Sequence, residues 1–203
     1  MTGIMVSFLL NEWRQEVKDR GTEQALLRDL LTDLRQDSVT LANEITEIDQ
    51  VMRYSQRLIE HAEVALPPDS VGRMLASCLS YSRIPLQRVT YQAMRSTGST
   101  GLLRDRELLH DVLKLYEQDY FMIDEICDID KRFVVDRMFP YVDARVDILD
   151  PDMDVLRSMF RDVQWRNLIQ SSRYFKQYLI QMMRSELEAV DDLIRRIEGQ
   201  VTP

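Results

Sequence analysis

Apolar residues in the first third of the chain recur at alternating intervals of four and three positions. The repeat comprises Leu27, Leu31, Leu34, Leu41, Ile45, Ile48, Met52 and Ile59, and Ser38 and Ser55 occupy its two remaining positions. This heptad spacing is typical of a helix that buries one stripe against partner helices. Residues 14–63 contain no proline and only one glycine, so we expect one long helix. Its stripe would pack within a bundle or pair with a second copy, and charged residues such as Asp33 and Asp37 would occupy solvated faces.

Prolines divide the middle of the chain into shorter elements. Pro67 and Pro68 end the first helix, because proline cannot continue one. Short helices are predicted over residues 69–81 and 85–95, and the glycine-containing stretch 96–101 predicts a loop.

Two further long helical regions follow this loop. Asp105 is a candidate N-cap for a helix over residues 106–138, which Phe139-Pro140 is expected to end. A last helical region is predicted over residues 152–198, with an interruption near Asp162. The fold class is therefore all-α: an antiparallel helical bundle with long N- and C-terminal helices and short helices between them.

Composition supports this fold class and limits the classes of molecule that the protein could bind. Six glycines and six prolines in 203 residues are too few for the many turns of a β-sandwich or barrel. The net charge of −8 and the lack of any lysine and arginine cluster disfavour nucleic acid, which requires a basic surface. Cys78 and Cys127 lack CxxC spacing, so a zinc site is unsupported, and the sequence leaves open whether they pair.

The first ten residues are the most unusual feature of the sequence. Residues 3–10 are largely apolar, but a membrane span takes about 20 such residues. The stretch is similar to the last third of a membrane helix, with a tryptophan at the interface and basic residues in the headgroup zone. The predicted membrane or interface residues are Ile4, Met5, Val6, Phe8, Leu9, Leu10, Trp13 and Arg14. Two alternatives are an amphipathic helix start docked on the fold, and a true start upstream of the given one.

The polar residues contain no recognisable catalytic or metal motif. The aspartates after Asp150 fail the calcium-loop pattern, because Val155 and Arg161 stand where glycine and glutamate are needed. Glu107 and His110 match half of a di-iron motif, with Asp124 and Asp128 as further carboxylates, but the position three before His61 is a leucine. We therefore predict no catalytic, cofactor or metal residues and no enzyme.

Three segments resemble an uncharacterised family of bacterial proteins with one N-terminal membrane helix and a helical or coiled-coil domain. They are residues 8–14 (FLLNEWR), similar to the family's Asn-x-Trp exit, residues 26–37 (LLRDLLTDLRQD), and residues 90–98 (TYQAMRSTG) with the leucines that follow. The resemblance covers about the first 120 residues. It implies a bacterial inner-membrane location and no known activity.

These observations lead to two hypotheses. In the first, residues 1–13 end a membrane or interfacial helix and residues 14–203 form a single bundle domain. The protein is then a non-catalytic, membrane-tethered interaction module or an accessory subunit of a membrane complex. Its partner would be another protein or a second copy bound through the long N-terminal helix, on an unknown side of the membrane. The alternative is a soluble helical metal-binding protein or enzyme that uses Glu107, His110, Asp124 and Asp128.

Overall fold

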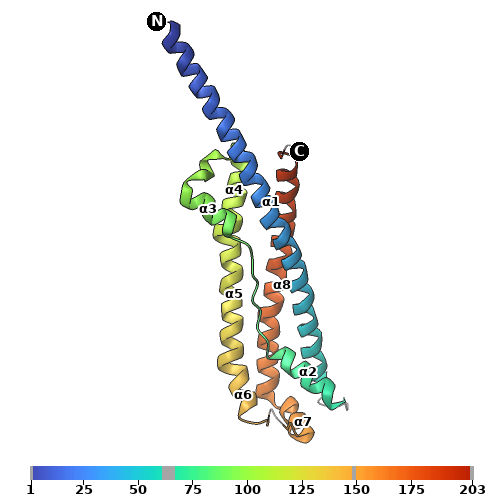
Figure 1. The fold of residues 1–203 in the computed structure, drawn as a ribbon. Helices are drawn as coiled ribbons and strands as arrows, with labels where there is room; N and C mark the ends of the chain where they lie inside the picture. The colour runs from blue at the N-terminus through green and yellow to red at the C-terminus, as the bar shows by residue number, and fades with distance from the viewer. Residues whose placement is uncertain (1, 61–66, 148–149, 202–203) are drawn as a thin grey trace. The chain divides into compact units, whose positions relative to one another are not determined.

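The structure is a computed structural model that describes residues 2–60, 67–147 and 150–201, with side chains from Leu10 onward. Every regular element in this part of the chain is helical. The elements are α1 (Thr2–Glu60), α2 (Pro68–Cys78), α3 (Val89–Thr97), η1 (Ser99–Leu102), α4 (Arg106–Lys114), η2 (Leu115–Asp119), α5 (Tyr120–Phe133), η3 (Val134–Met138), α6 (Phe139–Asp143), α7 (Met153–Arg161) and α8 (Val163–Glu198). The predicted all-α class is confirmed (Figure 1).

Backbone contacts divide the chain into two compact units. Unit 1 comprises Met1–Val39, Leu86–Tyr120 and Glu186–Pro203, and unit 2 comprises Thr40–Pro85 and Phe121–Ser185. Residues 14–203, predicted above to form a single bundle domain, contribute to both units, and unit 1 also includes residues 1–13; the single domain stays a prediction. Each unit is described by itself below.

The two long helices pack antiparallel, as predicted. In unit 1, Arg35 of α1 pairs with Glu198 of α8 at 2.6 Å, and Ser38 donates to Asp191 at 2.8 Å. In unit 2, Asp49 of α1 pairs with Arg184 of α8 at 3.3 Å. Arg173 of α8 also donates to the backbone carbonyl of Met52 in unit 2 at 2.9 Å. In both units, rising residue numbers along α1 therefore meet falling numbers along α8, which fixes the antiparallel direction.

The heptad stripe of α1 faces the interior. Leu27, Leu31, Leu34, Leu41 and Ile48 are buried, and Ile45, Met52 and Ile59 are half-buried. The prediction that Asp37 is solvated is wrong, because this carboxylate is completely buried. Asp37 lies three residues after Leu34 and four before Leu41, so helix geometry turns it inward with them.

A connector without regular structure, residues 80–88, follows α2. We predicted a helix over 85–95, but α3 begins only at Val89. In unit 1, the backbone N–H of Gln87 donates to Asp37 at 2.7 Å and that of Thr90 donates to Asp33 at 3.2 Å. These side-chain acceptors take the place of helical carbonyls, which allows the backbone to stay extended before α3.

The helical region after Asp105 is longer than predicted. Asp105 does cap α4, because its carboxylate accepts the N–H of Leu108 at 2.9 Å. Phe139-Pro140 does not end the region, since helix continues as α6 to Asp143. The π-helical turn η3 immediately before shifts the hydrogen-bond register, so that Pro140 occupies the first turn of α6, where its missing N–H is tolerated.

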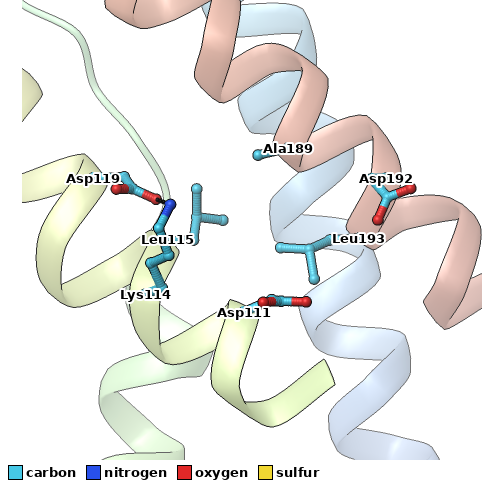
Figure 2. Close-up of a pocket in the computed structure, with 7 residues that line it drawn as sticks. All are labelled: Asp111, Lys114, Leu115, Asp119, Ala189, Asp192 and Leu193. Atoms are coloured by element: carbon cyan, nitrogen blue, oxygen red, sulfur yellow. Dashed lines mark hydrogen bonds and ion pairs between the residues drawn. The ribbon is translucent and has the colours of Figure 1, made fainter. Parts of the chain in front are cut away.

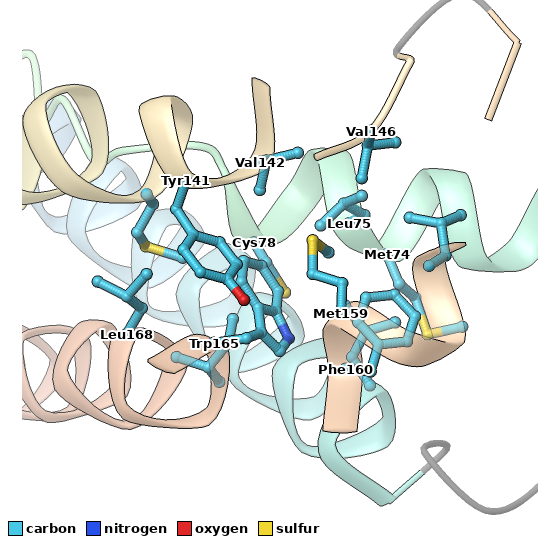
Figure 3. Packing of buried hydrophobic residues seen from close by; sticks show 14 of the residues in the cluster. Met74, Leu75, Cys78, Tyr141, Val142, Val146, Met159, Phe160, Trp165 and Leu168 are labelled. Atoms are coloured by element: carbon cyan, nitrogen blue, oxygen red, sulfur yellow. The ribbon is translucent and has the colours of Figure 1, made fainter. Parts of the chain in front are cut away.

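The break near Asp162 is confirmed. Asp162 is extended between α7 and α8, and it accepts hydrogen bonds from the Gln164 N–H at 2.8 Å and the Tyr141 hydroxyl at 2.7 Å. The core of unit 2 forms beside this break (Figure 3), with Trp165 fully buried at its centre. Its other labelled members are Met74, Leu75, Cys78, Tyr141, Val142, Val146, Met159, Phe160 and Leu168.

Candidate functional site

The carboxylate and histidine set weighed for a metal site does not form a cluster within either unit. Glu107 and His110 belong to unit 1, Asp124 and Asp128 belong to unit 2, and all four are exposed. Asp128 forms an ion pair with Arg132 at 3.2 Å on its own helix. Among the residues that the structure describes, no three histidine, cysteine or acidic side chains are grouped to hold a metal ion. His61 lies outside the described residues.

Both cysteines are free thiols in unit 2, which answers the question that the sequence left open. Cys78 is buried and Cys127 is half-buried. Burial raises the pKa of the Cys78 thiol to about 12, and burial together with the nearby Asp130 carboxylate raises that of Cys127 to about 12. A thiol with so high a pKa is a poor nucleophile at neutral pH.

A small pocket of about 100 Å³ lies in unit 1 between α4–η2 and α8 (Figure 2). Its lining residues are Asp111, Lys114, Leu115, Asp119, Ala189, Asp192 and Leu193. Lys114 pairs with Asp119 at 2.9 Å across the π-helical turn η2. Burial and the Asp119 carboxylate raise the pKa of neighbouring Glu186 to about 7. The volume is well below that of ordinary small-molecule sites, which begin at about 300 Å³.

The most buried polar cluster of unit 1 surrounds Asp37. Its carboxylate accepts the Tyr120 hydroxyl at 2.7 Å as well as the Gln87 N–H. Tyr116 packs edge-on against Tyr120, with ring centroids 5.2 Å apart, and its buried hydroxyl has no hydrogen-bond partner in the structure. Burial raises the pKa of Asp37 to about 6. Because this carboxylate is completely buried, its evident role is to hold the backbone before α3.

The most buried polar cluster of unit 2 is an ion pair. Lys176 of α8 and Asp130 of α5 are 2.8 Å apart, with side chains only 3% and 1% exposed. Asp130 also accepts the backbone N–H of Ser82 at 3.2 Å. Lys176 borders a cavity of about 230 Å³, whose lining includes Glu44, Glu47 and the connector residues Ser80 to Arg83. The pair thus anchors the unit-2 part of the connector.

Sequence reasoning missed these buried charges. Asp37, Asp130 and Lys176 all lie at positions that a helical repeat turns toward the core. Lys176, for example, comes four residues after the buried Ser172 and three before Leu179. The sequence did contain a signal, which is a charged residue at a position where the helical repeat places buried residues. Such a residue must either interrupt the repeat or have a buried partner.

Two larger hollows in unit 2 flank Asp162 at the break between α7 and α8. One, of about 550 Å³, includes Arg145, Ser158 and Arg161 in its lining. The other, of about 490 Å³, is lined by Phe133, Arg137, Asp162, Val163, Gln164, Asn167, Leu168 and Ser171. Their polar groups are hydrogen-bond donors and acceptors rather than an arrangement of nucleophile and base.

The predicted membrane residues lie at the N-terminal end of α1. Its backbone is helical from Thr2, and the side chains of Ile4, Met5, Val6, Phe8 and Leu9 lie outside the described ones. Leu10, Trp13 and Val17 are 50%, 63% and 52% exposed, and Arg14 is exposed as well. Within unit 1, this end of α1 extends beyond α3 and α4 (Figure 1). Across the described residues, no helix combines the length and the apolar character needed to cross a membrane.

Comparison with models of protein families, with curated proteins and with solved structures finds no match to the chain in any of the three.

Proposed function

We propose that this protein is a non-catalytic helical interaction module, tethered to a membrane through the N-terminal end of α1, and an accessory subunit of a membrane protein complex. The observation that carries the proposal is the exposed apolar row Leu10, Trp13 and Val17 toward the N-terminal end of α1. The same helix begins at Thr2, and the sequence of residues 3–10 is largely apolar. Such a helix end matches the likeness to a family with an N-terminal membrane helix.

The charges around this row support a lipid surface as the target. Glu12, Glu16 and Asp19 follow one another at helical spacing on a different face from the apolar row. Glu16 lies 3.7 Å from Arg104 of unit 1, so the acidic face is turned toward the rest of the unit. Arg14 and Lys18 share another face, one residue after Trp13 and Val17 respectively. Basic residues beside an apolar row with a tryptophan are typical of an interfacial helix.

Vesicle flotation of the full chain tests the proposal. We expect the wild-type chain to float with phosphatidylglycerol–phosphatidylcholine vesicles, and Val17→Asp to lower the bound fraction at least tenfold. Removing a half-exposed valine loses about 1 kcal/mol of burial, and a carboxylate among lipid tails costs at least as much again. Val39→Asp is the matched control, because Val39 is an exposed valine of the same helix, away from the N-terminal end.

Two results would overturn the proposal. One is a wild-type chain that stays with the protein fraction at every lipid concentration. The other is equal loss of binding in Val17→Asp and Val39→Asp, which would assign the effect to net charge rather than to the apolar row.

A further inference from the structure

Positive charge gathers in unit 2 around Asp162, at the break between α7 and α8. Arg161 lines one of the two hollows that flank Asp162, and Arg137 lines the other. Arg145, which also lines the first hollow, and Arg166 are close enough for their charges to act on the Asp162 carboxylate. We name Arg137, Arg145, Arg161 and Arg166 the arginine corner.

The arginine corner is an exception in a chain whose net charge is −8. Many exposed arginines of this chain pair with a carboxylate, as Arg184 of α8 does with Asp49 at 3.3 Å. In the part of the chain that the structure describes, no carboxylate lies within ion-pair distance of Arg137, Arg145 or Arg166. Their positive charges are therefore available to an anion from outside the chain.

Asp162 offsets only part of this positive charge. It is the one acidic residue among the described residues that line the two hollows. Its carboxylate already accepts the Tyr141 hydroxyl at 2.7 Å and the Gln164 N–H at 2.8 Å. The four surrounding arginines outnumber this single carboxylate, so the arginine corner carries a net positive charge.

Arg145 is held in place by other groups of unit 2. Its guanidinium lies 3.8 Å from the centroid of the Tyr141 ring, and its Nη1 donates to the Tyr141 carbonyl at 3.1 Å. A guanidinium has more N–H donors than this one hydrogen bond uses, so further donors remain for a ligand. Fixing the side chain beforehand lowers the entropy cost of binding.

The hollow beside Arg145 has the size and the lining of a small-molecule site. Its volume of about 550 Å³ lies within the ordinary range for such sites, about 300–1,000 Å³. The exposed Ser158 of α7 adds a hydroxyl donor to the two arginines. Val155 and Met159 add an apolar wall, and Met159 also belongs to the core shown in Figure 3.

We propose that this hollow binds a phosphate ester, with its phosphate group on Arg145 and Ser158 and its organic part against Val155 and Met159. Guanidinium groups donate paired hydrogen bonds to phosphate oxygens, and the doubly charged phosphate suits a site with excess positive charge. The inference does not rest on the membrane proposal above. A soluble ester and a lipid headgroup offer the same phosphate chemistry.

NMR titration of the full chain with glycerol 3-phosphate tests the inference. We expect saturable shifts at the amide of Ser158, with a dissociation constant on the order of 1 mM. Arg145→Gln should raise this constant at least tenfold, because hydrogen bonds between charged groups are the strong ones. Arg53→Gln is the matched control, because Arg53 is an exposed arginine of unit 2 whose hydrogen-bond partner, Gln50, is also neutral.

A second variant does not disturb the packing of Arg145 on Tyr141. Ser158→Asp places a carboxylate in the hollow and should abolish binding. Shifts no larger than those in potassium chloride of equal ionic strength would overturn the inference. So would equal weakening by Arg145→Gln and Arg53→Gln, or wild-type affinity in Ser158→Asp.

Vesicle flotation decides between the two sources of the phosphate group. If Arg145→Gln floats less well than Arg53→Gln with phosphatidylglycerol vesicles, the site takes a lipid headgroup. If the two variants float equally, it takes a soluble ester. The NMR titration contains no lipid, so its failure is distinguishable from a failure of the membrane proposal.

Discussion

The buried carboxylate of Asp37 can be tested with the substitution Asp37→Asn. Its two hydrogen-bond partners are the Gln87 N–H and the Tyr120 hydroxyl, both at 2.7 Å. An asparagine can keep both bonds, because its carbonyl oxygen accepts from Gln87 and its amide donates to the Tyr120 oxygen. The substitution therefore removes the charge and leaves the volume and the hydrogen bonds in place.

The magnitude follows from the pKa of Asp37, which burial raises from 3.8 to about 6, despite the opposing effect of its two hydrogen bonds. Between these values the folded chain binds more protons than the unfolded chain, so its free energy of unfolding falls as pH rises. The full loss is about 3 kcal/mol, reached above pH 6, and most of it develops between pH 4 and pH 7. Asp37→Asn does not titrate, so its gain over wild type should grow by about 2 kcal/mol across this interval.

Urea unfolding at a series of pH values measures this gain. The difference between variant and wild type cancels the titration of groups common to both chains, including Glu186. With a urea dependence of about 2 kcal/mol per molar, the variant's midpoint should move up by about 1 M relative to wild type between pH 4 and pH 7. A pH-independent difference would refute the reasoning, because it would show that the Asp37 carboxylate is no harder to ionise in the folded chain than in the unfolded one.

Three further substitutions test other parts of the structure. Lys176→Met should lower the free energy of unfolding by about 3–5 kcal/mol, because it leaves Asp130 charged and buried. Adding Asp130→Leu should restore most of the lost stability. A double variant as unstable as Lys176→Met would contradict the role of the buried, unpaired charge. Glu186→Gln should stabilise the chain by about 1–2 kcal/mol more at pH 8 than at pH 5, since the pKa of Glu186 is raised to about 7. Urea unfolding measures this difference, and a larger stabilisation at pH 5 than at pH 8 would be inconsistent with the burial of Glu186 beside Asp119. Gly98→Ala should cost about 1 kcal/mol in a thermal melt, because Gly98 ends α3 at a φ of 71°, and an unchanged melting temperature would contradict this.

Local patterns predicted the helices well and the connections less well. The heptad stripe predicted α1, the Asp105 cap predicted the start of α4, and Asp162 marked the break before α8, because each signal lies within a few residues of its effect. The predicted start of α3 was wrong because of a non-local contact. The predicted end of the helical region at Phe139-Pro140 was wrong because of a shift in the hydrogen-bond register. Asp37 holds Gln87 from 50 positions away, and the π-helical turn η3 makes Pro140 acceptable.

The candidate sites also divide into features that are visible in the sequence and features that require the structure. The exposed apolar row at Leu10, Trp13 and Val17 was visible in sequence as an apolar stretch followed by tryptophan. The buried ion pair of Lys176 and Asp130 was not, since it requires knowing that α5 lies beside α8. Helical periodicity alone identifies a row of residues on one helix, but it does not identify the neighbouring helix that supplies the partner.

Buried polar residues and exposed apolar residues in this structure have different explanations. Asp37 and Asp130 each accept a backbone N–H of the connector 80–88, so their burial is explained by the extended backbone that they hold. The burial of a carboxylate that holds the backbone in this way is explained without a chemical role. Exposed apolar groups have no such structural explanation, because leaving them in water is unfavourable. The N-terminal end of α1, with Leu10, Trp13 and Val17 exposed, is therefore the surface where we propose that binding recovers free energy that folding leaves unused.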